Sequence, residues 1–126
     1  MNTPHPPALD EAAVSTRLAA ELPHWRLQDG WIRRRVRTGG WKGTLMVVNT
    51  VGHLAEAAWH HPDLAVSFAF VEIKLCTHSA KGITERDFAL AQKVEEVLMW
   101  QPGLVPDSPL EGTPNDDARF RYIKYD

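Results

Sequence analysis

Residues 64–77 read Leu-Ala-Val-Ser-Phe-Ala-Phe-Val-Glu-Ile-Lys-Leu-Cys-Thr, and this stretch decides the fold. It is rich in residues that favour β-strands. From residue 70 onward, aliphatic residues occupy every second position, namely Val71, Ile73 and Leu75. A period of two predicts a strand that buries one of its faces. We therefore expect either one bent strand or two strands joined by a tight turn.

A second pair of strands is predicted upstream of this stretch. The runs Trp25–Leu27 and Trp31–Val36 flank the connection Gln28-Asp29-Gly30. A short connection that contains Asp-Gly between two such runs is a strong signal for a β-hairpin. The sequence therefore predicts two antiparallel strands here.

Two helices are predicted next to these strands. Asp10 can cap a helix that runs to about Glu21 and stops before Pro23. Apolar residues that recur at three- and four-residue steps predict a second helix over residues 41–59, and Pro62 follows it.

A third helix is expected after Thr84, because Asp87 lies three residues downstream in a capping-box pattern. It should reach about Met99. The resulting order α-β-β-α-β-β-α favours an α+β fold, in which three helices pack on one face of a four-stranded antiparallel sheet.

The length and composition indicate one domain. The chain has 126 residues, of which 44% are hydrophobic, and this is enough to fill one core. Residues 1–9 are rich in proline and are expected to be disordered, and residues 10–100 should form the domain. Residues 101–126 read as a linker followed by a tail, which contains Phe-Arg-Tyr-Ile-Lys-Tyr at positions 120–125.

Charge and cysteine content limit the classes of partner. The chain carries 14 Lys plus Arg and 16 Asp plus Glu, so it lacks the excess of positive charge that nucleic-acid binding requires. The single cysteine, Cys76, excludes a disulfide framework and paired-thiolate zinc sites. No export signal or membrane-spanning run is evident. We expect a cytoplasmic protein with no nucleic-acid or membrane partner.

Three of the six histidines are predicted to lie at the ends of elements. His60 and His61 lie at the end of the second helix, and His78 ends the last strand. Glu56 precedes His60 by four residues, so the two should share a helix face and hold a proton between them. Imidazole titrates close to neutral pH, and several imidazoles around one cavity therefore favour general acid/base catalysis on a small heterocyclic substrate.

Other interpretations of these residues remain open. His60 and His61 alone could form a helix C-cap, Asp87 could be only a capping residue, and Glu56 could be only a solvated helix residue. A zinc site made of the three histidines is disfavoured, because neighbouring histidines at a helix end rarely converge on one ion and no further ligand motif accompanies them. We predict no metal site.

At fixed spacing, these residues resemble the family of pterin-4a-carbinolamine dehydratases. The matching positions are Glu56, His60-His61-Pro62, Phe68, Thr77-His78, Gly82-Ile83-Thr84 and Asp87. The resemblance extends from about Ala13 to Leu98. A signature of several parts at fixed spacing is far more specific than a lone pair of histidines.

The resemblance implies an enzyme that removes water from 4a-hydroxytetrahydropterin to give quinonoid dihydropterin, without a metal or an organic cofactor. It implies that His60 and His78 transfer protons at N5 and at the departing 4a-hydroxyl, and that His61 positions the substrate. Glu56 and Asp87 would support the histidines. The remaining supporting or substrate-binding residues would be Pro62, Phe68 and Thr77. The resemblance also implies a homodimer or homotetramer.

The chain departs from the ordinary dehydratase in its proline-rich start, in Gly39-Gly40 before the second helix, in Leu64, and in the tail beyond Leu98. The start and the tail resemble dehydratase-like proteins found with α-carboxysomes, where the domain is similar to a Rubisco assembly factor. The alternative hypothesis is therefore a non-catalytic, carboxysome-associated module that binds Rubisco. Its tail would be a strand-adding or groove-binding peptide.

Overall fold

The computed structural model describes residues 6–114 and 116–125 and confirms the predicted α+β fold. The main elements are α1 (Glu11–Glu21), β1 (Arg26–Gln28), β2 (Trp31–Arg37), α2 (Trp41–Ala58), β3 (Asp63–Ser67), β4 (Phe70–Leu75) and α3 (Glu85–Leu98). Short 3₁₀ helices lie at η1 (His78–Ala80), η2 (Pro102–Leu104) and η3 (Ala118–Phe120).

The predicted disordered start falls partly outside the described residues, because these begin at residue 6. The backbone N–H of Leu9 donates a hydrogen bond to the carbonyl of Ile83 at 2.7 Å, and the Leu9 side chain packs against the core. The chain is therefore attached to the domain from Leu9 onward.

The four strands form one antiparallel sheet in the order β1-β2-β4-β3. The predicted hairpin is present, but its connection is one residue shorter than predicted, because Gln28 belongs to β1 and pairs with Trp31. Asp29 and Gly30 form the turn, and both have positive φ (54° and 80°), as a tight hairpin turn requires. The stretch 64–77 contains two strands, since Ser67 pairs with Phe70 across a tight turn.

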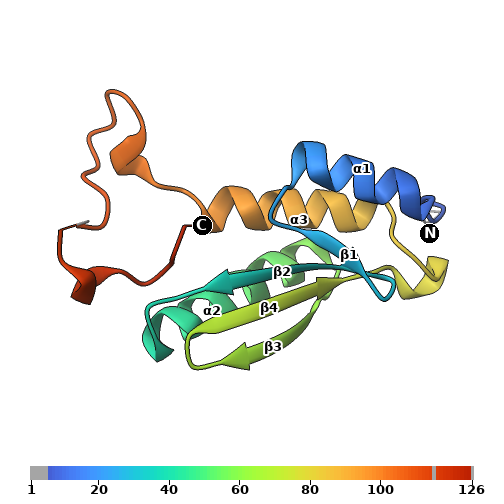
Figure 1. Cartoon of the computed structure of the whole chain (residues 1–126), viewed down its shortest axis with the longest axis horizontal. Coiled ribbons are helices and arrows are strands. Elements are labelled where there is room, and N and C mark those ends of the chain that lie inside the picture. The colour runs from blue at the N-terminus through green and yellow to red at the C-terminus, as the bar shows by residue number, and fades with distance from the viewer. Residues whose placement is uncertain (1–5, 115, 126) are drawn as a thin grey trace.

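One face of this sheet carries the core, and the three helices cover it (Figure 1). Alternation at period two directs Ile32, Val36, Val71, Ile73 and Leu75 toward the helices, and all five are buried. The helices supply the other side of the core with Val14, Leu18, Val47, Val51, Phe88, Ala91 and Val94.

Helix α2 ends one residue earlier than predicted, at Ala58. Trp59 lies in the left-handed region with φ 52° and ψ 47°. The backbone N–H of Trp59 donates to the backbone carbonyl of Glu56 at 3.2 Å, and the backbone N–H of His60 donates to the backbone carbonyl of Ala55 at 3.1 Å. This pair of bonds is a Schellman motif, which closes the helix and turns the chain away from its axis.

The C-terminal tail folds back on the start of α2. Ile123 is buried in the core and forms a β-bridge with Thr38. The N–H of Lys124 donates to the carbonyl of Arg37 at 2.9 Å, and the N–H of Gly39 donates to the carbonyl of Tyr122 at 3.2 Å. The tail thus continues the hydrogen bonding of β2 beyond its last residue.

The histidines and the tail lie at opposite ends of the molecule (Figure 1). Helix α2 ends, β4 ends and α3 begins at the end that carries η1 and the N-terminal segment. Strand β2 ends and α2 begins at the other end, where the tail is docked.

Within residues 6–114 and 116–125, none of the helices combines the length and the apolar character that a membrane span needs.

Two glycines of α2 allow a matched test of tail docking. A Cβ at Gly43 would collide with the carbonyl of Tyr122, whereas a Cβ at Gly52 would meet nothing within 4 Å. We expect Gly43→Ala to lower the free energy of unfolding by about 1–3 kcal/mol through overpacking. Gly52→Ala should raise it by roughly 0.5–1 kcal/mol, because alanine favours a helix. Urea denaturation of both variants measures the difference, and two changes of the same sign would contradict the docking.

The pH dependence of tail docking should follow Tyr125. Burial, together with the neighbouring Tyr122, raises the pKa of Tyr125 to about 12. Because the folded chain favours the neutral phenol, its contribution to docking is complete below the ordinary tyrosine pKa of about 10 and is lost as the pH rises toward 12. Tyrosinate absorbance should show a late step that Tyr125→Phe abolishes. A single step near the ordinary pKa in the unmodified chain would contradict this expectation.

Candidate active site

The buried carboxylate of Asp87 is the centre of the candidate site. Its Oδ2 accepts hydrogen bonds from the backbone N–H of Thr84 at 2.9 Å and from the hydroxyl of Thr77 at 2.7 Å. Its Oδ1 lies 2.6 Å from Nε2 of His60. Asp87 is fully buried, and a buried carboxylate is stable only when such bonds replace its lost hydration.

Local sequence brings these groups together from three elements. The predicted capping box is present, with Thr84 and Asp87 bonding reciprocally at the start of α3. Thr77 is the second residue after β4, and its hydroxyl also lies 2.8 Å from the hydroxyl of Thr84. The Schellman turn at the end of α2 supplies His60. Asp87 therefore caps α3 and also lies within hydrogen-bonding distance of His60.

The orientation of His60 follows from its bond to Asp87. Either ring nitrogen of an imidazole can donate or accept, and it is Nε2 that His60 directs to the Asp87 carboxyl. The side chain of His60 is only 11% exposed, so the ring is held in place.

The structure corrects the predicted partner of Glu56, which is His61 and not His60. Glu56 Oε1 lies 2.6 Å from Nε2 of His61. The i,i+4 relation to His60 fails because α2 ends at Ala58, before the helix can carry residue 60 onto the face of Glu56. The His61 ring also lies edge-on to Trp59, at 5.0 Å between centroids.

His78 does not end β4 as predicted, because the strand ends at Leu75 and His78 lies in η1, beside two residues that the sequence did not indicate. Its ring is perpendicular to that of Trp31 at 5.5 Å between centroids, and Sγ of Cys76 lies 3.8 Å from its Nδ1. The period of β4 could have placed Cys76 near His78, but Trp31 arrives through strand register, which one sequence does not show. Burial raises the pKa of the Cys76 thiol, so it stays protonated and unreactive at neutral pH.

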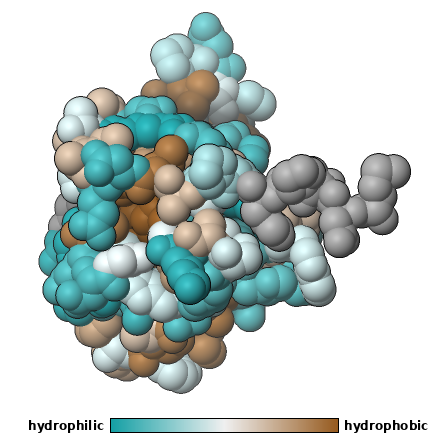
Figure 2. Space-filling model, turned by 90° about the vertical axis from the view of Figure 1, so that its right-hand side faces the viewer, coloured by the Kyte–Doolittle hydropathy of each residue, from teal (hydrophilic) through white to brown (hydrophobic). Residues whose placement is uncertain are grey.

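The topology brings all three histidines to one end of the molecule, where His60 is linked to Thr77, the neighbour of His78, through Asp87. Figure 2 faces this end and shows an apolar patch bordered by hydrophilic side chains. Among the described residues, no hydrogen bond joins one imidazole to another. The three rings contact different neighbours.

Of the other predicted residues, Pro62 connects His61 to β3, but Phe68 lies elsewhere. Phe68 is in the turn at the far end of β3, beside Gly40, and is 67% exposed. A position six residues after Pro62 falls at the opposite end of a five-residue strand, so the structure does not bring Phe68 to the histidines.

In the part of the chain that the structure describes, no three His, Cys, Asp or Glu side chains are grouped so that they could hold a metal ion.

Comparisons with known proteins add to this geometry. Residues 7–97 match the family model described as pterin 4 alpha carbinolamine dehydratase. A protein of Aquifex aeolicus (strain VF5) named "Putative pterin-4-alpha-carbinolamine dehydratase" is 47% identical over 90 residues, which are 71% of this chain and 90% of that protein. A protein of the same name from Chloroflexus aurantiacus is 40% identical over 92 residues, 73% of this chain and 98% of its own.

Among solved structures, the crystal structure of a transcriptional coactivator/pterin dehydratase from Brucella melitensis matches with a TM-score of 0.65 and 26% identity. The match covers 71% of this chain and 97% of that one. The C-terminal segment from residue 98 onward lies outside the family match.

The hydroxyl of Thr77 should be needed to hold Asp87. Thr77→Val keeps the shape and removes one of the hydrogen-bond donors to a buried carboxylate, so we expect a loss of about 1–3 kcal/mol in the free energy of unfolding. Thr50→Val is the control, because the hydroxyl of half-buried Thr50 donates to the carbonyl of Met46 within α2, at 2.8 Å. Urea denaturation and the NMR shift of the His60 imidazole measure the effect. Equal losses in both variants would contradict this role for Thr77.

Proposed function

Since the chain belongs to the pterin 4 alpha carbinolamine dehydratase family, we propose that it is a 4a-hydroxytetrahydropterin dehydratase that uses histidines as general acid and base. The observation that carries this proposal is the bond between His60 and the buried Asp87 carboxylate, at the same end of the molecule as His61 and His78. Asp87 would hold a proton on Nε2 and leave Nδ1 of His60 for the substrate.

The proposed reaction needs one proton removed and one delivered. A base takes the proton from N5 of the pterin, the electron pair forms the double bond to C4a, and the C4a–O bond breaks. An acid protonates the departing hydroxyl, so that water leaves and quinonoid dihydropterin remains. His60 and His78 would share these two roles, and each would contribute about 10²–10⁴-fold in rate.

His61 would position the substrate. Its Nε2 is bonded to Glu56 and its ring rests against Trp59, so two contacts limit its rotation although the side chain is 49% exposed. An exposed but oriented imidazole suits a hydrogen bond to a polar edge of a bound heterocycle. Glu56 would act through His61, and Asp87 would act through His60.

The proposal also includes the expected homodimer or homotetramer. Helix α2 leaves three large apolar side chains substantially exposed, Trp41 at 51%, Leu45 at 40% and Met46 at 41%. Apolar residues at i, i+4 and i+5 form a stripe that a second copy of the helix could cover.

The Rubisco assembly hypothesis is not favoured. It depended on the tail as a peptide for a partner, but the tail pairs with the chain's own Thr38 and buries Ile123 in the core. The relatives described above carry dehydratase names, and the family match spans the histidine-bearing domain.

Loss of either proton-transfer histidine should remove most of the activity. With chemically generated 4a-hydroxytetrahydropterin, we expect the rate of quinonoid product formation above background to fall about 10²–10⁴-fold in His60→Ala and in His78→Ala. His53→Ala is the matched control, because His53 is exposed on α2, and it should keep full activity. Circular dichroism would confirm that each variant is folded. An unmodified chain no faster than the background reaction would refute the proposal.

A further inference from the structure

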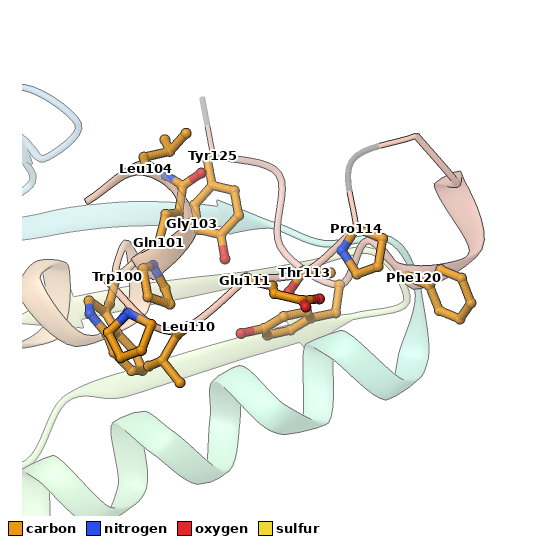
Figure 3. A pocket seen from close by; sticks show the side chains of 14 residues that line it. Trp100, Gln101, Gly103, Leu104, Leu110, Glu111, Thr113, Pro114, Phe120 and Tyr125 are labelled. Carbon is orange, nitrogen blue, oxygen red and sulfur yellow. The ribbon is translucent and has the colours of Figure 1, made fainter. Parts of the chain in front are cut away.

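A cavity of about 760 Å³ lies at the end of the molecule opposite the histidines (Figure 3). All of its lining residues fall between Trp100 and Tyr125, so they lie outside the segment that matches the dehydratase family. Its volume is within the range of small-molecule sites, roughly 300–1,000 Å³.

Both walls of the cavity are anchored. On one side, the backbone at Gly103 lies so close to the carbonyl of Glu111 that a Cβ at Gly103 would collide with it. Gly112 has φ 82°, a conformation that glycine adopts readily. These two glycines let the two ends of the loop contact each other. On the other side, Tyr122 accepts a hydrogen bond from Gly39, and Ile123 is buried in the core. Because both segments are held by these contacts, the space between them is part of the folded structure.

The lining is aromatic and aliphatic. Trp100, Phe120, Tyr122 and Tyr125 contribute four rings, and in Figure 3 the hydroxyl of Tyr125 is directed into the cavity. Leu104 and Leu110 are 70% and 51% exposed at its wall. Exposed apolar side chains gathered around a cavity favour a ligand with an apolar part.

The lining of the cavity carries a negative charge. Glu111 is its one charged side chain, and no ion pair joins Glu111 to another described residue. Residues 101–117 contain four Asp or Glu and no Lys, Arg or His. Arg121 and Lys124 line a smaller adjoining cavity of about 450 Å³, which shares Thr113, Pro114, Tyr122 and Tyr125 with the first.

We propose that this cavity binds a small organic cation of the quaternary ammonium class. Aromatic faces attract a cation through their quadrupoles, and a cage of such rings is the usual receptor for alkylated ammonium groups. The apolar methyl groups would cover Leu104 and Leu110, and Glu111 would supply the opposite charge. This site does not depend on the dehydratase proposal, because no residue is shared between the two.

The test compares three probes of similar shape by NMR titration of the full chain. Choline carries a trimethylammonium group, its neutral isostere carries a tert-butyl group in the same place, and tert-butylacetate adds a carboxylate. We expect choline to change the NMR chemical shifts of residues 100–125 until the site is saturated. It should bind at least roughly tenfold more tightly than the neutral isostere. Equal or tighter binding of either other probe, shifts confined to the histidine-bearing end, or no binding of choline would overturn the proposal.

Two glutamate variants isolate the charge. Glu111→Gln keeps the shape of the cavity and should weaken choline binding roughly tenfold. Glu96→Gln makes the same change on α3 outside the cavity and should leave choline binding unchanged. Trp100→Leu removes one ring and should also weaken binding, while urea denaturation reports whether the variant is folded. Choline affinity equal in both glutamate variants would overturn the role of Glu111.

Discussion

A carboxylate removed from water must be hydrogen-bonded, and Asp87 imposes this requirement on the histidine-bearing end of the molecule. Its oxygens contact the start of α3, the segment between β4 and η1, and the residues after α2, through Thr84, Thr77 and His60. Three separate elements end or begin at this one buried carboxyl group. The same bonds that stabilise the charge orient the imidazole, so stability and proposed chemistry share one set of contacts.

The end of α2 decides what the two adjacent histidines do. Trp59 occupies the left-handed region, where a residue with a side chain is strained by about 1–2 kcal/mol. This strain is offset by the two Schellman hydrogen bonds and by the contacts beyond them. The turn sends His60 inward to Asp87 and leaves His61 outside against Trp59 and Glu56. One backbone conformation thus separates a largely buried imidazole from an exposed one.

The opposite end shows how an extension was added to a family domain. Gly39 and Gly43 leave room for the backbone of residues 121 and 122, and Ile123 completes the core. Gly39 therefore accounts for one residue of the Gly-Gly interruption before α2, and Gly40 is the N-cap of that helix, with φ 152°. The added segment encloses a cavity with its own lining and charge, so a second binding function can exist without disturbing the histidines.

The sequence by itself determined the element order, the hairpin at Asp29-Gly30 and the capping box of α3. It also indicated His60, His61 and His78 as the histidines that lie near the ends of elements. These features could be predicted because periodicity, turn chemistry and caps act between residues close in the chain. Only the tertiary structure decided that Glu56 pairs with His61, that Trp31 lies against His78 and that Phe68 lies far from the site. Each of these depends on where a helix ends in space or on how strands align. Such contacts between distant segments are set by packing and register, and these leave no local signal in one sequence.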